Sequence, residues 1–149
     1  MQITILTIGK TKSSEIQSLI DDFLNRIKKF KVQVMALKAY GDDIEKEQNE
    51  IDLKLKEMGG NIKTYLMTEW GQTYTSKKFA DKIQKHYESS DKLVFILGGA
   101  SGFTDEFRQK FNQQFSLSNM TFPHEMAKLM LVEQIYRAQA IMDNHPYSK

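Results

Sequence analysis

The chain has 149 residues, of which 40% are hydrophobic and 27% are charged, and its formal net charge is +2 at pH 7. These values are ordinary for a globular protein, and the length predicts one domain over residues 1–149. So small a net charge does not indicate a nucleic-acid-binding protein, although a local basic face is enough to bind phosphates. The absence of cysteine excludes a disulfide framework, a thiol nucleophile and a cysteine-based zinc site.

The sequence carries no signal for a membrane or for export. No apolar segment approaches the ~20 residues that a bilayer-spanning helix needs. The N-terminal segment 1–8 lacks the basic start and the small-residue cleavage site of a signal peptide. We therefore expect a cytoplasmic protein.

Apolar, β-branched segments alternate with amphipathic ones, which predicts an α/β fold with helices flanking a mostly parallel sheet. Strands are expected at residues 3–8, 32–37, 62–68, 93–97 and 115–118. Helices are expected at residues 13–30, 44–58 and 76–87, over a short stretch from Thr104, and from about 124 to 143. The 44–58 helix has many charges and a thin apolar stripe, so we expect it to be exposed. Residues 69–72 are predicted to form the loop after the third strand.

The segment after the fourth strand is the most informative one for function. Residues 93–97 are apolar at every position, as in a strand covered on both faces, and Gly98-Gly99-Ala100-Ser101-Gly102 follows at once. Glycines at the carboxyl end of a strand let a ligand approach the backbone closely. Open α/β sheets bind their ligands at that edge. We therefore expect the ligand site here, with a purely structural turn as the alternative.

Several common site chemistries do not match this glycine loop. It lacks the Gly-Lys-Ser/Thr of a phosphate-binding loop and the spacing of the dinucleotide fingerprint. Ser101 does not stand in the Gly-x-Ser-x-Gly motif of hydrolases. The three histidines, His86, His124 and His145, fall in separate segments without the spacing of a zinc pair, so no metal site is predicted.

The last predicted helix is apolar around more than half of its circumference. Its apolar residues are Met126, Ala127, Leu129, Met130, Leu131, Val132, Ile135, Tyr136, Ala138, Ala140, Ile141 and Met142. An outer helix of a small domain needs only one apolar stripe, so we expect a second surface to be covered. A symmetric homodimer is the natural second surface, and a central helix buried within a monomer is the alternative.

Four segments in combination resemble one known family. They are Gly98-Gly99-Ala100-Ser101-Gly102, residues 117–124, Glu133-Gln134-Ile135-Tyr136-Arg137-Ala138 and the terminal His145-Pro146-Tyr147-Ser148-Lys149. Together with residues 3–10, they resemble the ribosomal large-subunit methyltransferase H family over the whole chain. The resemblance implies a SPOUT-class fold with a C-terminal trefoil knot, and a homodimer. It also implies transfer of a methyl group from S-adenosylmethionine to N3 of a pseudouridine in large-subunit (23S) ribosomal RNA, either free or in the ribosome.

The resemblance further implies where the cofactor pocket lies. It falls on Met67 at the end of the third strand, on Gly98, and on Leu117, Ser118, Asn119, Met120, Thr121 and Phe122. Many relatives have leucine in place of Met67, which is a mild exchange because both side chains are apolar and similar in volume. Backbone groups at three converging strand ends would bind the adenine and ribose of S-adenosylmethionine.

Three side chains are candidates for catalysis. N3 of a pyrimidine must lose a proton, so a base or an anion-stabilising cation assists the transfer. His124 is the candidate base, with a structural hydrogen-bond donor as its alternative role. Arg137 could hold a phosphate or the developing anion, or it could pair with Glu133 one turn earlier. Tyr147 in the tail could stack on RNA or form a hydrogen bond to it.

The tail departs from the family pattern. Relatives usually end in Tyr-His and a basic residue, whereas this chain ends in Tyr147-Ser148-Lys149. Ser148 cannot take up a proton at neutral pH, but it can donate a hydrogen bond. Lys149 can contact phosphate, and His145 could replace the missing histidine or cap the helix end. Two further basic sets could contact RNA or be ordinary solvated faces: Arg26, Lys28, Lys29 and Lys31, and Lys77, Lys78, Lys82 and Lys85.

Two functions of different class are therefore open. The first is the ribosomal RNA methyltransferase, working without a metal. The second is a non-catalytic nucleotide- or RNA-binding α/β module that keeps the cofactor pocket but has lost transfer through its altered tail. The intact pocket motif favours the first.

Overall fold

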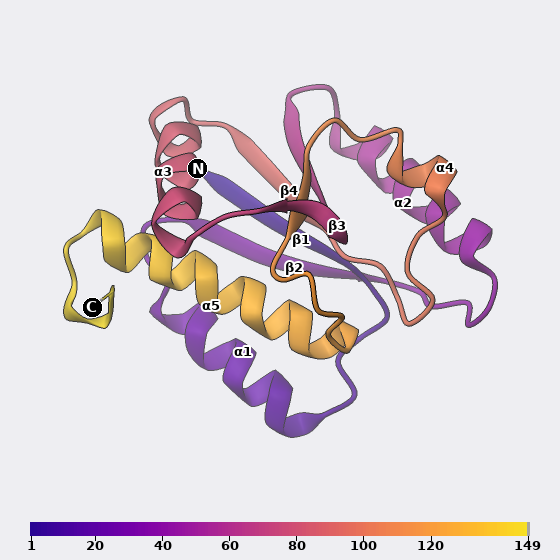
Figure 1. Ribbon diagram of the computed structural model, residues 1–149, viewed down its shortest axis with the longest axis horizontal. Helices are drawn as coiled ribbons and strands as arrows, with labels where there is room; N and C mark the ends of the chain where they lie inside the picture. Colours follow the sequence, from indigo (N-terminus) through magenta and orange to yellow (C-terminus); the bar gives the residue numbers. More distant parts are fainter. Residues whose placement is uncertain (149) are drawn as a thin grey trace.

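A parallel sheet of five strands forms the centre of the structure, a computed structural model that describes residues 1–148 (Figure 1). The strands are β1 (Gln2–Ile8), β2 (Lys31–Leu37), β3 (Ile62–Thr73), β4 (Lys92–Ile96) and β5 (Gln114–Ser116). The helices are α1 (Ser14–Arg26), α2 (Ile44–Met58), α3 (Ser76–Glu88), α4 (Asp105–Arg108) and α5 (His124–Met142), followed by the 3₁₀ turn η1 (Pro146–Ser148). The strand order is β2-β1-β4-β3-β5 with every neighbouring pair parallel, which confirms the predicted α/β fold.

The sheet is covered on both faces by separate hydrophobic cores. On one face, Ile5 and Phe95 belong to a core shared with α1, α3 and α5. On the opposite face, Leu6 and Ile96 belong to a core shared with α2 and α4. Because successive residues of a strand point to opposite faces, an unbroken apolar strand such as β4 serves both cores. Covering both faces leaves the carboxyl edge of the sheet as the place for a ligand.

Helix α1 is shorter than the predicted 13–30 helix and ends at Arg26. The backbone N–H groups of Lys28 and Lys29 both donate to Gln139 Oε1 of α5, each at 2.8 Å. This contact with a distant helix takes the place of the helical hydrogen bonds in the last predicted turn. The chain therefore leaves the helix early and turns into β2.

Strand β3 is longer than predicted, and the prediction of a loop at residues 69–72 is wrong. Met67 and Gln72 both lie opposite Phe115 of β5, so the register shifts between them. Gly71 makes this shift possible, because a Cβ on it would stand 2.7 Å from backbone atoms of Gln114 and Phe115. The glycine lets β3 pass directly against β5. Residues 68–71, which we call the β3 bulge, lie between these two paired positions and have no partner in the ladder with β5.

Helix α2 has the predicted bounds, but it is not simply an exposed helix. Glu47 and Gln48 are only 4% and 8% exposed. Glu47 Oε2 accepts a hydrogen bond from the Tyr40 N–H at 2.8 Å, and Gln48 Oε1 accepts one from the Thr104 N–H at 2.9 Å. These two polar side chains hold the loop before α2 and the start of α4 in place.

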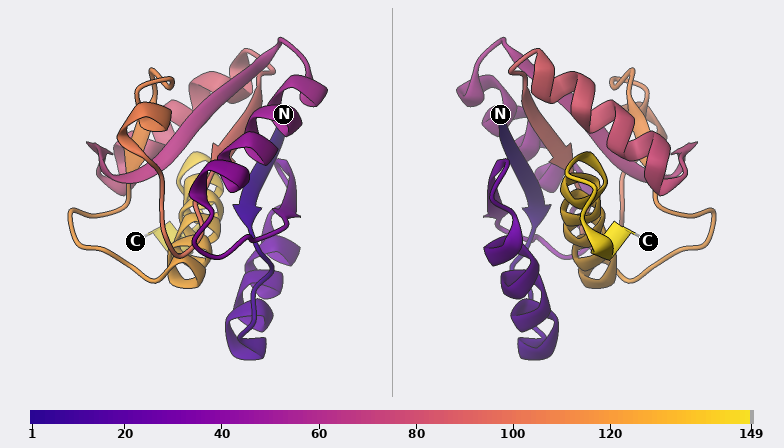
Figure 2. Two further views of the ribbon diagram at one scale, coloured as in Figure 1. Left: turned by 90° about the vertical axis from the view of Figure 1, so that its right-hand side faces the viewer. Right: turned by 90° about the vertical axis from the view of Figure 1, so that its left-hand side faces the viewer.

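Strand β5 ends at Ser116 and not at the predicted residue 118. The Ser116 hydroxyl donates to the Ser118 carbonyl at 2.7 Å, which turns the chain away from the sheet. Residues 117–123 then project from the molecule before the chain enters α5, as the orange segment in Figure 2 shows, and we call them the 117–123 loop. The trefoil knot implied by the family resemblance stays a prediction.

Candidate active site

A cleft of about 690 Å³ lies at the carboxyl edge of the sheet. It is lined by the β3 bulge, the glycine loop after β4, the 117–123 loop and the start of α5. The lining includes most of the pocket residues that the resemblance implies: Met67, Gly98, Leu117, Ser118, Met120, Thr121 and Phe122. Asn119 is exposed in the same loop but does not line the cleft. The volume lies within the range of small-molecule sites, about 300–1,000 Å³.

The glycines of the loop after β4 pack closely against neighbouring protein atoms. A Cβ on Gly98 would stand 3.1 Å from the ring of Phe103 and 3.3 Å from the backbone of Gly102. A Cβ on Gly99 would stand 3.1 Å from Ile8. Gly102 has φ +70°, a left-handed conformation that favours glycine. The glycines therefore also serve the close packing of the loop against the protein, and their role in giving a ligand access to the backbone stays a prediction.

The 117–123 loop presents backbone groups that the protein does not use. Within residues 1–148, the backbone N–H groups of Asn119, Thr121 and Phe122 have no hydrogen-bond partner. The Met120 N–H donates to Ser118 Oγ at 3.0 Å, which shapes the loop. The Thr121 hydroxyl donates to the Glu69 carboxylate and so joins this loop to the β3 bulge. The loop is thus tied to the β3 bulge, while these three amides stay available to a polar ligand.

His124 is the first residue of α5, lines the cleft and is exposed. Its neighbour Glu125 accepts hydrogen bonds from the backbone N–H groups of Lys12 and Ser13 at 3.1 and 3.2 Å. These two hydrogen bonds hold the pKa of Glu125 below its usual range, because they stabilise the carboxylate. The start of α5, and with it His124, is therefore anchored to the loop that follows β1.

Arg137 and Tyr147 lie together near the C-terminal end of α5, at the side of the molecule where the chain ends (Figure 1). Arg137 Nε is 2.9 Å from Glu133 Oε1, and the Tyr147 hydroxyl donates to the same oxygen at 2.9 Å. The hydrogen bond to Glu133 raises the pKa of Arg137. Burial, and then the Glu133 carboxylate, raise the pKa of Tyr147.

This cluster is remote from the cleft of its own chain. A helical rise of 1.5 Å per residue separates Arg137 from His124 by about 20 Å along α5. The structure therefore does not bring Arg137 and Tyr147 to His124 within one chain, and Arg137 forms the pair with Glu133 that was its alternative role.

The remaining tail residues complete the end of α5. The His145 N–H donates to the Ala140 carbonyl at 2.8 Å, so His145 takes part in closing the helix. The Ser148 hydroxyl donates to the His145 carbonyl at 2.8 Å. Lys149 lies outside the described residues.

Neither of the two basic sets lines the cleft. In the first set, Arg26 pairs with Asp22 and Lys29 pairs with Asp143, each at 2.9 Å. The second set lies on α3, where Lys82 Nζ stands 5.1 Å from the ring centre of Tyr74. An RNA contact for either set stays a prediction.

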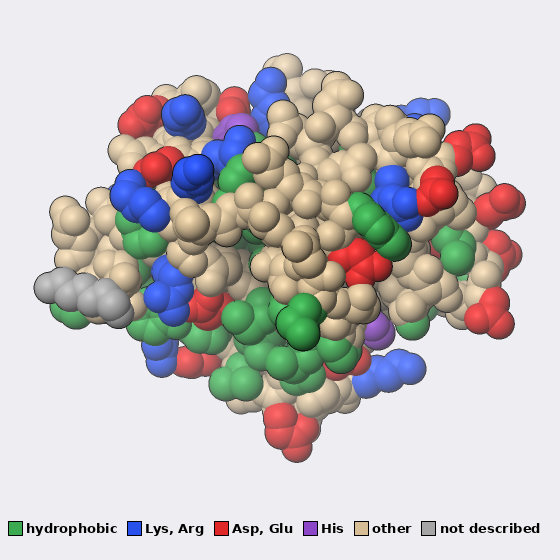
Figure 3. All heavy atoms as spheres, viewed as in Figure 1, with side chains coloured by type: hydrophobic (Ala, Val, Ile, Leu, Met, Phe, Trp, Pro, Cys, Tyr) green, Lys and Arg blue, Asp and Glu red, His purple; other side chains and the backbone are tan. Residues whose placement is uncertain are grey.

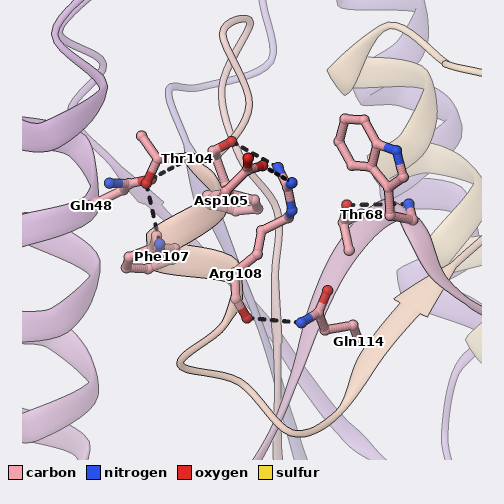
Figure 4. A network of polar contacts seen from close by, with 9 residues as sticks. Gln48, Thr68, Thr104, Asp105, Phe107, Arg108 and Gln114 are labelled. Carbon is pink, nitrogen blue, oxygen red and sulfur yellow. Dashed lines mark hydrogen bonds and ion pairs between the residues drawn. The ribbon is translucent and has the colours of Figure 1, made fainter.

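Two residues at the cleft were missed by the sequence analysis. Trp70 of the β3 bulge lines the cleft and is 68% exposed, and its ring centre lies 4.3 Å from the guanidinium carbon of Arg108. Arg108, the last residue of α4, points toward Asp105 and pairs with it (Figure 4). The only sequence signal was a single tryptophan beside a glycine, in a segment predicted to be a loop.

Comparison with known proteins identifies the family. The family described as "Predicted SPOUT methyltransferase" matches residues 1–148. The "Ribosomal RNA large subunit methyltransferase H" of Flavobacterium psychrophilum is 37% identical over 99% of this chain and 98% of its own. The protein of the same name from Acholeplasma laidlawii is 34% identical over the whole of both chains. The chain belongs to the ribosomal RNA large-subunit methyltransferase H family. The resemblance read from the motifs is thereby confirmed.

Solved structures share the fold of this chain at much lower sequence identity. A probable methylase family protein from Haemophilus influenzae Rd KW20 has a TM-score of 0.57 at 12% identity, over 95% of this chain and 68% of that one. A putative methylase family protein from Neisseria gonorrhoeae has a TM-score of 0.54 at 11% identity, over 90% of this chain and 81% of that one. These likenesses concern the fold alone.

Within the described part of the chain, no helix combines the length and the apolar character needed to cross a membrane. Residues 1–148 also hold no group of three or more His, Cys, Asp or Glu side chains that could bind a metal.

Proposed function

We propose that this protein transfers the methyl group of S-adenosylmethionine to N3 of a pseudouridine in large-subunit ribosomal RNA, in the cytoplasm. The observation that carries the proposal is the cleft, because the glycine loop and the 117–123 loop meet at the sheet edge where ligands of α/β proteins bind. The names of the full-length relatives support methyl transfer to large-subunit ribosomal RNA, and N3 of a pseudouridine is what the family resemblance implies.

The residues of the cleft fit S-adenosylmethionine. Its adenine and ribose need hydrogen-bond partners, which the free backbone N–H groups of the 117–123 loop can supply. Met67, Leu117 and Phe122 offer apolar contacts to the flat base. The cofactor supplies a sulfonium methyl group that is already activated for displacement. The task left to the protein is to hold the base and the methyl group in line, a proximity effect worth ~7–11 kcal/mol.

His124 is proposed as the group that receives the N3 proton, since its imidazole is exposed at the cleft. Arg137 and Tyr147 are proposed to act at the cleft of a second subunit, because they lie about 20 Å from the cleft of their own. There the guanidinium would hold a phosphate or the developing anion. Such an arrangement requires a homodimer.

Exposed apolar side chains on α1 and α5 support this dimer. Leu131 and Ile135 of α5 are fully buried within the chain, so most of this helix is already covered. Leu19, Met126 and Met130 remain 49%, 40% and 36% exposed. Hydrophobic side chains gather over α1 and α5 in Figure 3, where they form a patch that a second copy would cover.

Light scattering at micromolar concentration should give twice the 17.3 kDa chain mass. Met126→Lys with Met130→Lys places two charges in the patch and should yield monomers. Leu53→Lys on the exposed side of α2, where Leu53 is 61% exposed, should leave the dimer intact and is the matched control. A wild-type monomer with full activity would contradict the dimer.

Gly98→Val should abolish binding of S-adenosylmethionine, because the added side chain would displace Phe103 and the Gly102 backbone and deform one wall of the cleft. Calorimetry in the presence of a chelator measures this, and the wild type should bind under the same conditions. Unchanged binding by the variant would place the cofactor elsewhere.

The proposed reaction is tested with labelled S-adenosylmethionine and ribosomes from cells that lack this protein. We expect label in large-subunit RNA, and mass mapping should find it on one pseudouridine. Cofactor binding without any transfer, to ribosomes or to free RNA, would instead support the non-catalytic nucleotide-binding module.

A further inference from the structure

The β3 bulge places Trp70 at the cleft. The β3 bulge exists because Gly71 lets β3 pass within van der Waals distance of β5, with no space for even one Cβ. The Trp70 N–H donates to Thr68 Oγ1 at 3.3 Å, a contact within the bulge. Bulges beside binding sites commonly aim one side chain away from the sheet. Here the side chain so aimed is the only tryptophan of the chain.

One face of the Trp70 ring is covered by a guanidinium that is itself held in place. The Arg108 side chain is only 17% exposed and pairs with Asp105. Its Nη1 also donates to the Phe103 carbonyl at 3.1 Å. Figure 4 shows the guanidinium between Asp105 and the segment of β3 that carries Thr68. Arg108 is thus a rigid support for the indole. Its guanidinium carbon lies 4.3 Å from the ring centre of Trp70, in a cation–π contact.

The other face of the ring is open. With one face against Arg108, a side chain that is still 68% exposed must present its opposite face to solvent, and Trp70 lines the cleft. So exposed a tryptophan adds little to the hydrophobic core. A flat apolar surface, fixed from behind and open in front, is suited to stack a nucleobase.

We propose that Trp70 stacks a base of the RNA substrate beside the methyl donor, with Arg108 as its positioning residue. The proposal rests on the proposed function. An enzyme that acts on a base must take that base out of its stack, and an aromatic platform replaces the stacking that is lost. The substrate base is favoured over the adenine of S-adenosylmethionine because the free amides that fit the cofactor lie on the 117–123 loop, whereas Trp70 lies on the wall formed with α4.

The test compares Trp70→Ala and Trp70→Phe with the control Leu53→Ala, which removes a similarly exposed apolar side chain from α2. For each variant, methyl transfer to ribosomes from cells lacking the protein gives kcat and KM, and calorimetry gives the Kd of S-adenosylmethionine. We expect Trp70→Ala to lower kcat/KM for ribosomes about tenfold or more, the effect of losing one base–aromatic stack. Trp70→Phe should restore most of the activity, and the Kd of S-adenosylmethionine should stay unchanged in every variant.

The role of Arg108 is tested with Arg108→Met alone and combined with Trp70→Ala. The single variant should lower kcat/KM, and the double variant should be no worse than Trp70→Ala, since the support matters only while the platform is present. Additive losses would overturn the positioning role.

Full activity of Trp70→Ala would overturn the stacking proposal. A raised Kd for S-adenosylmethionine in that variant, with quenching of wild-type tryptophan fluorescence by S-adenosylmethionine alone, would also overturn it, because Trp70 would then contact the cofactor. If the wild type methylated no RNA while still binding S-adenosylmethionine, the proposed function would fail first and this inference with it.

Discussion

Deleting residues 147–149 should reduce methyl transfer to ribosomes about a hundredfold or more while leaving S-adenosylmethionine binding nearly intact, since groups essential to a reaction commonly contribute that much. The cleft proposed to bind the cofactor is lined by loops at the sheet edge, and Tyr147 lies at the far end of α5. The tail can therefore affect the cleft only from a second subunit or through the RNA. Transfer assays with calorimetry on the same protein separate these two readouts.

Point variants show how much of the effect of the deletion comes from each tail residue. Tyr147→Phe keeps the ring packed at 4.7 Å from the ring of Tyr136 but removes the hydroxyl that donates to Glu133. It should lose part of the activity if the hydroxyl orients the Glu133–Arg137 pair. Ser148→His, which restores the residue type usual in relatives, should raise activity modestly or leave it unchanged. Loss of cofactor affinity on truncation would show that the tail closes over S-adenosylmethionine, and full activity would show that the terminal motif has no catalytic role here.

Gly71→Ala should destabilise the protein by about 2 kcal/mol or more and weaken S-adenosylmethionine binding at the same time, since overpacking alone costs ~1–3 kcal/mol. The added methyl group would stand 2.7 Å from backbone atoms of Gln114 and Phe115, and backbone cannot rotate away as a side chain can. Strands β3 and β5 would have to separate. That movement would displace the β3 bulge and the 117–123 loop, the two walls joined by Glu69 and Thr121. Urea unfolding and calorimetry measure the two effects.

Gly60→Ala is the matched control for this substitution. It makes the same chemical change in the turn before β3, where a Cβ would meet nothing within 4 Å. Its stability should change by less than about 1 kcal/mol, or rise slightly, because alanine restricts the unfolded chain. Equal stability of the two variants would mean that Gly71 does not control the spacing of β3 and β5.

The family motifs read from the sequence placed the pocket residues on three separate segments, and the fold brings these segments to one cleft. Sequence reasoning predicted correctly that the segments meet, because each follows a strand and the carboxyl ends of parallel strands lie at one edge, whereas their role as a cofactor pocket stays a prediction. It failed where contacts with residues far away in the sequence decided the local conformation. Gln139 of α5 ends α1 early, and the backbone of β5 turns a predicted loop into the second half of β3.

By itself, the sequence determined the α/β class, the order of the elements and the segments that meet at the cleft, because the period of apolar residues and the positions of glycine are local properties of the chain. Only the tertiary structure decided which side chains share a site. It set Arg137 and Tyr147 on Glu133, away from His124, and it placed Trp70 against Arg108. Such pairings depend on strand register and on the spacing between packed elements, which residues far apart in the chain set together.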